Sequence, residues 1–206
     1  MTLSRSTLAD WVGRIGVALE PLWLRLAELL RQGPVLHADE TPVQQLDPGK
    51  GKTKRAYLWA YRSNVLGSEP SIVVFDYQPG RGGKYVVEFL AGWQGALMVD
   101  EFAGYQVLFR GEVIELACMT HARRKFFDLH QANGSPVAAE ALRRIGELYA
   151  IEATAKGETV EERARRRKET SQPLLEALHL WLLNTRRTVA DGGALARAID
   201  YSLRRW

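Results

Sequence analysis

Residues 96–100 read ALMVD, which is four apolar side chains followed by an acid. A short and fully apolar run of this kind is typical of a central strand that is buried on both faces. Residues 35–39, VLHAD, have a similar form, with mostly apolar side chains leading to an acid. We therefore expect Asp39 to follow the end of a first strand and Asp100 to follow the end of a fourth strand.

These two aspartates are candidate metal ligands. A carboxylate at the end of a buried strand costs free energy unless it is paired, bound to a metal or solvated. If the first and fourth strands are neighbours, Asp39 and Asp100 converge at one edge of the sheet. Such carboxylates suit Mg²⁺, and two such ions can activate a nucleophile and stabilise a leaving oxygen in phosphoryl transfer. Aspartate after a strand is also a common turn residue or helix cap, so the residues alone leave both interpretations open.

Runs rich in β-branched and aromatic residues predict the other strands. Extended runs cover residues 35–46, 56–62 and 71–77, and a fifth strand is expected at 113–118. The first two runs are joined at 47–55 by a turn rich in glycine and lysine. A short helix is expected between the third and fourth strands. Three antiparallel strands, a helix and two further strands predict a mixed α/β sheet.

Helical periodicity marks both ends of the chain. Apolar residues recur at 3–4 residue spacing from Leu8 to Leu30, and Pro21 is expected to begin a second helix there. Residues 3–11 also resemble the second helix of a helix-turn-helix, although a packing helix explains them as well. After Thr120 the chain is expected to be helical over residues 120–131, 137–156, 159–184 and 193–205.

Composition excludes several classes of protein. The chain has 206 residues and one cysteine, which rules out a disulfide framework and a cysteine-rich zinc module. No run of 18 apolar residues occurs, so no transmembrane helix is expected. The first ten residues lack the apolar core of a signal peptide, and a cytoplasmic protein with no membrane partner is the expectation.

Positive charge is concentrated in the second half of the chain. Residues 1–109 carry 11 basic and 11 acidic side chains, whereas residues 110–206 carry 17 basic and 13 acidic. A basic half indicates either a polyanionic partner or a solvated helical surface. The expected helix start at residues 121–125, HARRK, has the same two interpretations, a phosphate-binding end or a capped surface helix.

Five ordered stretches resemble the core of insertion-sequence-66 family transposases. They are residues 36–43 (LHADETPV), 57–61 (YLWAY), 75–81 (FDYQPGR), 97–105 (LMVDEFAGY) and 118–126 (CMTHARRKF). The resemblance covers about residues 34–127, and five motifs in order make it specific. Phe102 departs from the family, which usually has tyrosine at that position.

The resemblance implies a ribonuclease-H-like fold with an Asp-Asp-Glu triad that binds two divalent ions, Mg²⁺ or Mn²⁺. By position, Asp39 matches the first acid and Asp100 the second, which makes both catalytic and metal-binding residues. The third acid lies in the family in an Asn-Arg-x-Glu motif, which does not occur here. The expectation is therefore an inactive fragment of a transposase, truncated at both ends.

The resemblance also implies DNA partners, namely transposon ends and target DNA. His121, Arg123, Arg124 and Lys125 are expected to position DNA phosphates. The expected division is a helical N-terminal segment at 1–33 that is a remnant of a DNA-binding region, a ribonuclease-H-like core at 34–131, and a helical extension at 132–206. Two other functions stay open: a non-catalytic remnant that binds DNA or an intact transposase, and a nuclease of the same fold. Besides DNA, the expected partners are a second copy of the chain, as a homo-oligomer, or an intact transposase.

Overall fold

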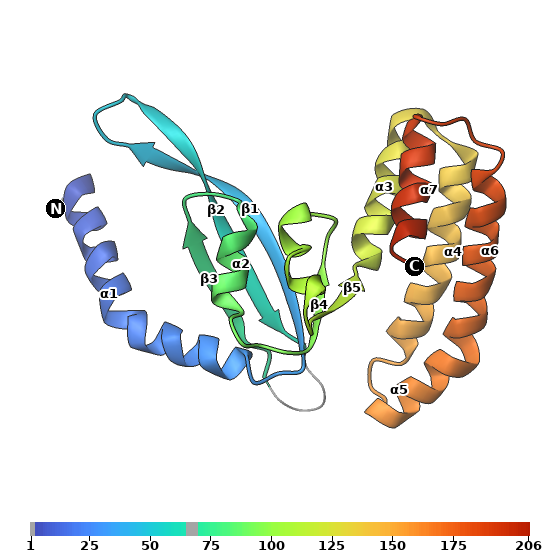
Figure 1. Ribbon diagram of the computed structural model, residues 1–206, viewed down its shortest axis with the longest axis horizontal. Coiled ribbons are helices and arrows are strands. Elements are labelled where there is room, and N and C mark those ends of the chain that lie inside the picture. Colours follow the sequence, from blue (N-terminus) through green and yellow to red (C-terminus); the bar gives the residue numbers. More distant parts are fainter. Residues whose placement is uncertain (1–2, 65–69) are drawn as a thin grey trace. The chain divides into compact units, whose positions relative to one another are not determined.

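The structure is a computed structural model that describes residues 3–64 and 70–206. The chain folds as two compact units, Met1–Leu116 and Ala117–Trp206 (Figure 1). Each unit has a hydrophobic core of its own, and the two cores share no residue. The first unit holds the sheet and the second is helical, so the candidate acids and the candidate DNA-binding cations belong to different units.

The first unit is built on one mixed sheet in the order β3-β2-β1-β4-β5. Its strands are β1 (Val35–Asp47), β2 (Lys52–Ser63), β3 (Val73–Gln78), β4 (Ala96–Val99) and β5 (Ile114–Ala117). β2 pairs antiparallel with both β1 and β3, whereas β1 pairs in parallel with β4. The expected order of three antiparallel strands, a helix and two further strands is confirmed, and with it the mixed α/β class.

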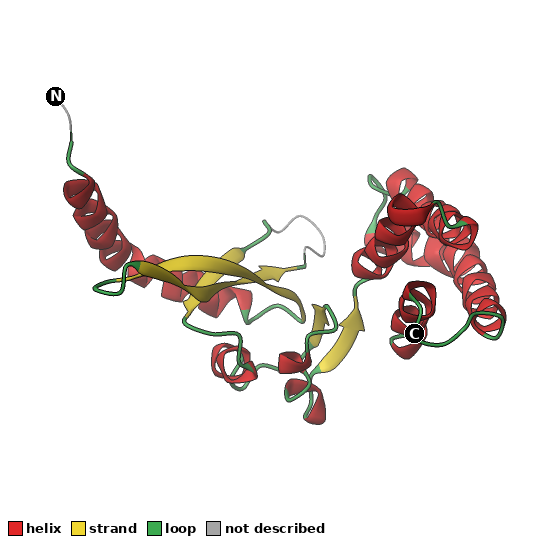
Figure 2. Cartoon of the chain, turned by 90° about the horizontal axis from the view of Figure 1, so that it is seen from above, coloured by secondary structure: helices red, strands yellow, loops and turns green. Residues whose placement is uncertain are grey.

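One face of this sheet carries the core of the unit. Because side chains alternate along a strand, Leu36 and Ala38 of β1 are buried while His37 between them is only partly buried. Helix α2 (Gly83–Phe89) packs against this face (Figure 2). The Phe89 ring stacks on the Tyr61 ring of β2 at a centroid distance of 3.8 Å. The opposite face of the sheet is the one on which Asp39 lies.

The hairpin of β1 and β2 projects beyond the other strands (Figure 1). It closes in a tight turn that places Gly49 at φ 83° and Gly51 at φ 59°, which are left-handed conformations that glycine adopts without steric cost. β3 pairs with β2 only from Tyr57 to Arg62, so the outer part of the hairpin has no third strand. The connection from β2 to β3 includes residues 65–69, which lie outside the described residues.

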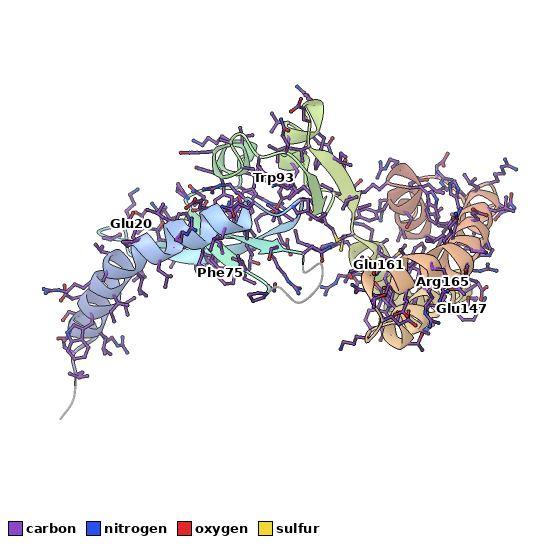
Figure 3. All side chains as sticks on the ribbon, turned by 90° about the horizontal axis from the view of Figure 1, so that it is seen from below. Glu20, Phe75, Trp93, Glu147, Glu161 and Arg165 are labelled. Carbon is purple, nitrogen blue, oxygen red and sulfur yellow. The ribbon has the colours of Figure 1, made fainter. Side chains whose placement is uncertain are left out.

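Helix α1 (Arg5–Leu30) is one continuous helix. The expected second helix at Pro21 is therefore wrong, because the chain keeps its helical course through the proline and bends there (Figure 1). Only the last part of α1 packs on the sheet, where the Trp23 indole donates to the Phe75 carbonyl oxygen at 2.7 Å. Phe75 and Glu20 are labelled in Figure 3.

The second unit is a cluster of helices. It comprises α3 (Met119–Asn133), α4 (Pro136–Thr154), α5 (Val160–Arg166), α6 (Gln172–Arg186) and α7 (Ala194–Arg204). The expected helices are confirmed in order, but that at 159–184 is interrupted by a π-helical turn, Arg167–Ser171. Pro173 explains the interruption, since proline has no N–H to donate to the carbonyl oxygen of Glu169.

Among the described residues, no helix is both long and apolar enough to cross a membrane.

Candidate active site

β1 and β4 are parallel neighbours, and their pairing register, extended past its last pair, matches Asp39 with Asp100. The strands pair Val35 with Ala96 and His37 with Met98, so each pair is 61 positions apart along the chain. Asp39 and Asp100 are separated by the same 61 positions. Adjacent strands lie about 4.8 Å apart. The pairing register, continued by two residues, therefore leads to the two carboxylates.

The two acids reach this position differently. Asp100 directly follows Val99, the last residue of β4, as the sequence predicts. Asp39 was expected to follow the end of the first strand, and this is wrong, because β1 continues to Asp47. Asp39 is thus a mid-strand residue whose side chain is exposed on the open face of the sheet.

Each carboxylate is oriented by one local hydrogen bond. The backbone N–H of Glu40 donates to Asp39 Oδ1 at 2.9 Å, and the backbone N–H of Phe102 donates to Asp100 Oδ1 at 2.8 Å. Within the described residues, no hydrogen bond reaches the second oxygen of either group. One oxygen of each aspartate is held and the other is available to a hard cation, which fits the donor chemistry that Mg²⁺ or Mn²⁺ requires.

Directly behind Asp39, the carboxylate of Glu40 is buried in the core. Glu40 follows Asp39 in the strand, so it points to the opposite face, and its side chain is 0% exposed. The Tyr105 hydroxyl donates to Glu40 Oε2 at 2.6 Å, and Arg81 Nε donates to Glu40 Oε1 at 2.7 Å. A buried carboxylate is tolerated when it has a cation and hydrogen bonds of this kind.

A chain of contacts links this buried cluster to the second aspartate. The Arg81 guanidinium lies over the Phe102 ring at 3.9 Å from the centroid, an arrangement that favours the cation. Phe102 in turn donates its backbone N–H to Asp100. Gly104 must be small here, since a Cβ atom would lie 2.2 Å from the Phe102 ring. Glu40, Arg81 and Phe102 therefore connect the backbone beside Asp39 to the turn that orients Asp100.

Burial and charge set the protonation of the cluster. Burial raises the pKa of Glu40, while the hydrogen bonds from Tyr105 and Arg81 lower it and the charge of Asp100 raises it further. Burial also raises the pKa of the Tyr105 hydroxyl, and its bond to Glu40 adds to that effect. The phenol consequently stays protonated and acts as a donor to Glu40.

This buried cluster was missed at the level of sequence. Glu40 and Arg81 entered the sequence analysis only as members of the matching stretches 36–43 and 75–81. One signal was available, because Leu36, Ala38 and Glu40 alternate on the buried face of a strand. The partner of Glu40 was not visible, since Arg81 lies 41 positions away and is brought in by the fold.

The four expected DNA-binding residues all lie in the first turns of α3, but they do not share a face. At about 100° per residue, His121, Arg124 and Lys125 fall within roughly 100° of one another, and Arg123 lies on another side. Arg124 and Lys125 are exposed, and the Lys125 ammonium lies 4.2 Å from the centroid of the Tyr201 ring. His121 Nδ1 is buried without a hydrogen-bond partner among the described residues.

No third acid joins the two aspartates among the described residues. No group of three or more histidine, cysteine, aspartate or glutamate side chains in residues 3–64 and 70–206 is arranged to hold a metal ion. Glu140 pairs with Arg143 and Arg144, and Glu147 pairs with Arg143, as expected for surface ion pairs. The hydrogen bond from Arg143 is the main reason that the pKa of Glu140 falls to about 2. Glu147 is labelled at the surface of the helical unit in Figure 3.

Comparison with known proteins agrees with the motifs. Uncharacterized protein y4jD of Sinorhizobium fredii (strain NBRC 101917 / NGR234) is 35% identical over 216 residues, which cover 100% of this chain and 42% of the relative. Uncharacterized protein y4qI of the same organism is 35% identical over 215 residues, which cover 98% of this chain and 40% of the relative. The chain thus spans less than half the length of these relatives. The model of the family described as "Transposase IS66 family" matches residues 1–206, and the chain therefore belongs to the IS66 family of transposases.

Proposed function

We propose that this chain contributes two metal-binding aspartates, Asp39 and Asp100, to the catalytic core of a DNA transposase of the Asp-Asp-Glu type. The observation that carries the proposal is the parallel pairing of β1 with β4, whose register leads to both acids. Membership of the IS66 transposase family supports DNA as the substrate. The reaction is cleavage at transposon ends followed by strand transfer into target DNA.

The proposed fold of the core is ribonuclease-H-like. Its support is the order of elements, with three antiparallel strands, helix α2 and then two further strands in one mixed sheet. In this arrangement the two acids come from strands that are distant in sequence and adjacent in the sheet.

The residues of the proposed site have different roles, namely metal binding and contact with DNA phosphates. Asp39 and Asp100 would hold Mg²⁺ or Mn²⁺ through the oxygens that their local hydrogen bonds leave available. Ions held there would activate the attacking water or hydroxyl and stabilise the leaving oxygen in phosphoryl transfer. Arg124 and Lys125, exposed at the start of α3, together with His121 and Arg123 are proposed to contact DNA phosphates.

A metal titration tests the proposal. Free Mn²⁺ is followed by electron paramagnetic resonance as it is added to wild type, Asp39→Asn and Asp100→Asn. We expect each substitution to weaken binding at least about tenfold, because the loss of a ligand costs no less than the loss of an outer-shell partner. Equal binding by wild type and Asp100→Asn would remove Asp100 from the site.

Asp47→Asn is the matched control for this titration. Asp47 is the last residue of β1 and its carboxylate lies 3.3 Å from the Lys50 ammonium, away from the proposed site. This variant changes the same charge on the same strand and should bind Mn²⁺ as wild type does. A loss of binding in Asp47→Asn equal to that in Asp39→Asn would mean that the ions respond only to net charge.

A further inference from the structure

The outer part of the β1–β2 hairpin is a two-stranded ribbon without support from the sheet. Residues 44–55, named here the basic ribbon, pair only with each other, because β4 pairs with β1 from Val35 to His37 and β3 pairs with β2 from Tyr57 to Arg62. Figure 1 shows the ribbon extending past the end of β3. A two-stranded hairpin by itself is at best marginally stable in water. The ribbon is therefore a long projecting element that packing in its own unit does not explain.

The basic ribbon collects positive charge in a unit that is otherwise balanced. Residues 44–55 hold four of the 11 basic side chains of residues 1–109 and a single acid, Asp47. Asp47 is occupied by an ion pair with Lys50. Lys52, Lys54 and Arg55 are exposed, and no carboxylate in the described part of the chain lies within ion-pair distance of them. Three unneutralised cations thus lie on one strand of the ribbon.

Alternation along β2 distributes these cations over the ribbon. Lys52 and Lys54 lie on one face and Arg55 on the other, and both faces also carry polar side chains. On the second face, the Thr53 hydroxyl donates to Gln44 Oε1 at 3.0 Å across the strands. Beside this bond, Leu46 is 76% exposed, so no apolar core forms on either face. An exposed, polar and positively charged surface of this kind suits a polyanion rather than an apolar partner.

We propose that the basic ribbon is a DNA-binding arm that lies along duplex DNA and contacts its phosphates through Lys52, Lys54 and Arg55. The inference rests on the proposed function and deepens it, since it names a surface for the DNA on the same unit as Asp39 and Asp100. The major groove of B-DNA accepts a two-stranded β-ribbon, whereas the major groove of an A-form RNA helix is too narrow. Contacts to phosphates carry no sequence information, so binding by this arm is independent of sequence.

The salt dependence of DNA binding tests the arm. Affinity for a short fluorescein-labelled DNA duplex is measured by anisotropy over a series of KCl concentrations, for wild type and Lys52→Gln/Lys54→Gln. Each phosphate contact contributes about 0.9 to the slope of log affinity against log salt concentration, so the double variant should flatten the slope by about 1.8. A parental slope in this variant would overturn the proposal. Circular dichroism confirms that the variant is folded.

Arg14→Gln/Arg25→Gln is the matched control. It removes two positive charges from exposed positions of the same unit, where Arg14 pairs with Asp10 and Arg25 with Glu28 on α1. The control should keep the parental slope. An equal flattening in both double variants would overturn the proposal, because affinity would then follow net charge alone. Equal affinity and slope for duplex RNA would contradict the choice of partner.

The Mn²⁺ titration separates this inference from the proposed function. If Lys52→Gln/Lys54→Gln binds Mn²⁺ as wild type does and has a flattened slope, the arm is supported independently of the metal site. If Asp39→Asn and Asp100→Asn leave Mn²⁺ binding unchanged while the ribbon variant flattens the slope, the metal site fails and the arm stands. Absence of DNA binding by wild type would count against both proposals.

Discussion

Two consecutive residues of β1 place their carboxylates in opposite environments. Asp39 is exposed on the open face of the sheet, while the Glu40 carboxylate is enclosed by Tyr105 and Arg81 on the core face. Strand alternation places the two side chains on opposite faces of the sheet. They are nevertheless coupled, because the backbone N–H of Glu40 donates to the Asp39 carboxylate and orients it. A shift of the Glu40 backbone would therefore move the N–H that orients a proposed ligand.

Glu40→Gln should change how the stability of the fold depends on pH. Burial raises the pKa of Glu40 in the folded protein above its ordinary value of 4.5, so the folded state binds the proton more tightly than the unfolded state. The contribution of Glu40 to the free energy of unfolding of wild type should therefore fall as pH rises from about 4.5 through the raised pKa. Glutamine cannot ionise, so the variant should lack this fall and should gain stability relative to wild type over that interval.

Urea unfolding of both proteins at a series of pH values measures this difference. His37, whose pKa is lowered by burial and by Arg62, is present in both proteins and cancels. The quantity of interest is the slope of the stability difference with pH rather than its absolute size, since the amide also changes the bonds to Tyr105 and Arg81. A stability difference that does not vary with pH would show that Glu40 titrates normally in the folded state.

At the scale of elements, glycines divide into those that the structure needs and those that it does not. Added Cβ atoms at Gly13 and Gly16 of α1 would meet nothing within 4 Å, whereas a Cβ at Gly95 would lie 2.5 Å from the Pro34 carbonyl oxygen. Gly95 lies directly before β4, where the chain approaches the backbone leading into β1. Its smallness therefore contributes to the strand pairing on which the candidate site depends.

Gly13→Ala and Gly16→Ala should each stabilise the exposed first half of α1. Alanine favours a helix over glycine by about 0.5–1 kcal/mol, which corresponds to about two- to five-fold slower amide hydrogen exchange in this segment. Gly95→Ala should instead destabilise the whole sheet unit by about 1–3 kcal/mol through overpacking. Hydrogen exchange followed by mass spectrometry distinguishes the local gain from the global loss. Slower exchange in all three variants would contradict the contrast.

The positions of the strands and helices were more predictable from sequence than the residues at which they begin and end. Apolar and β-branched runs located all five strands, and the aspartate after β4 was placed correctly. The first strand carried two expectations, an extended run to Leu46 and an end before Asp39, and β1 follows the longer one through Pro42 to Asp47. Proline is tolerated there, since β4 pairs with β1 only as far as His37 and the missing N–H breaks no bond on that side. Pro21 was likewise interpreted from local preference alone.

At the scale of the whole molecule, the sheet and the helices form separate cores, so the candidate acids and the α3 cations do not share a folding unit. Sequence grouped both in one core because the motifs follow one another along the chain. Local sequence carries no information on which hydrophobic faces meet. The helical unit contributes Phe126 of α3 and Ile199 of α7 to one core, while the sheet unit buries Trp59 and Tyr61 in the other.

The polypeptide 1–206 by itself should not carry out end-specific cleavage or strand transfer. Positioned metal ions supply most of the catalysis in phosphoryl transfer, and only two carboxylates are assigned to the site. The assay uses the purified polypeptide with Mn²⁺ and a supercoiled plasmid that carries the element's ends. Robust end-specific cutting or joining would refute the expectation. Two acids of the helical unit, Asp128 of α3 and Glu140 of α4, are the candidates for a third ligand in that case. Loss of the activity in Asp128→Asn or Glu140→Gln would then identify the third acid.

If the proposed arm and the proposed metal site act on one duplex, the length of β1 sets a distance along that DNA. Asp39 and Asp47 are eight residues apart on one uninterrupted strand, which spans about 27 Å at roughly 3.4 Å per residue. Base pairs in a duplex are stacked about 3.4 Å apart, so the same span covers about eight base pairs. If β1 connects the proposed metal site at Asp39 to the DNA-binding ribbon at Asp47, its length fixes the separation of the two sites. Phosphates held by the tip then lie a fixed number of base pairs from the bond that is broken, whatever the sequence between them.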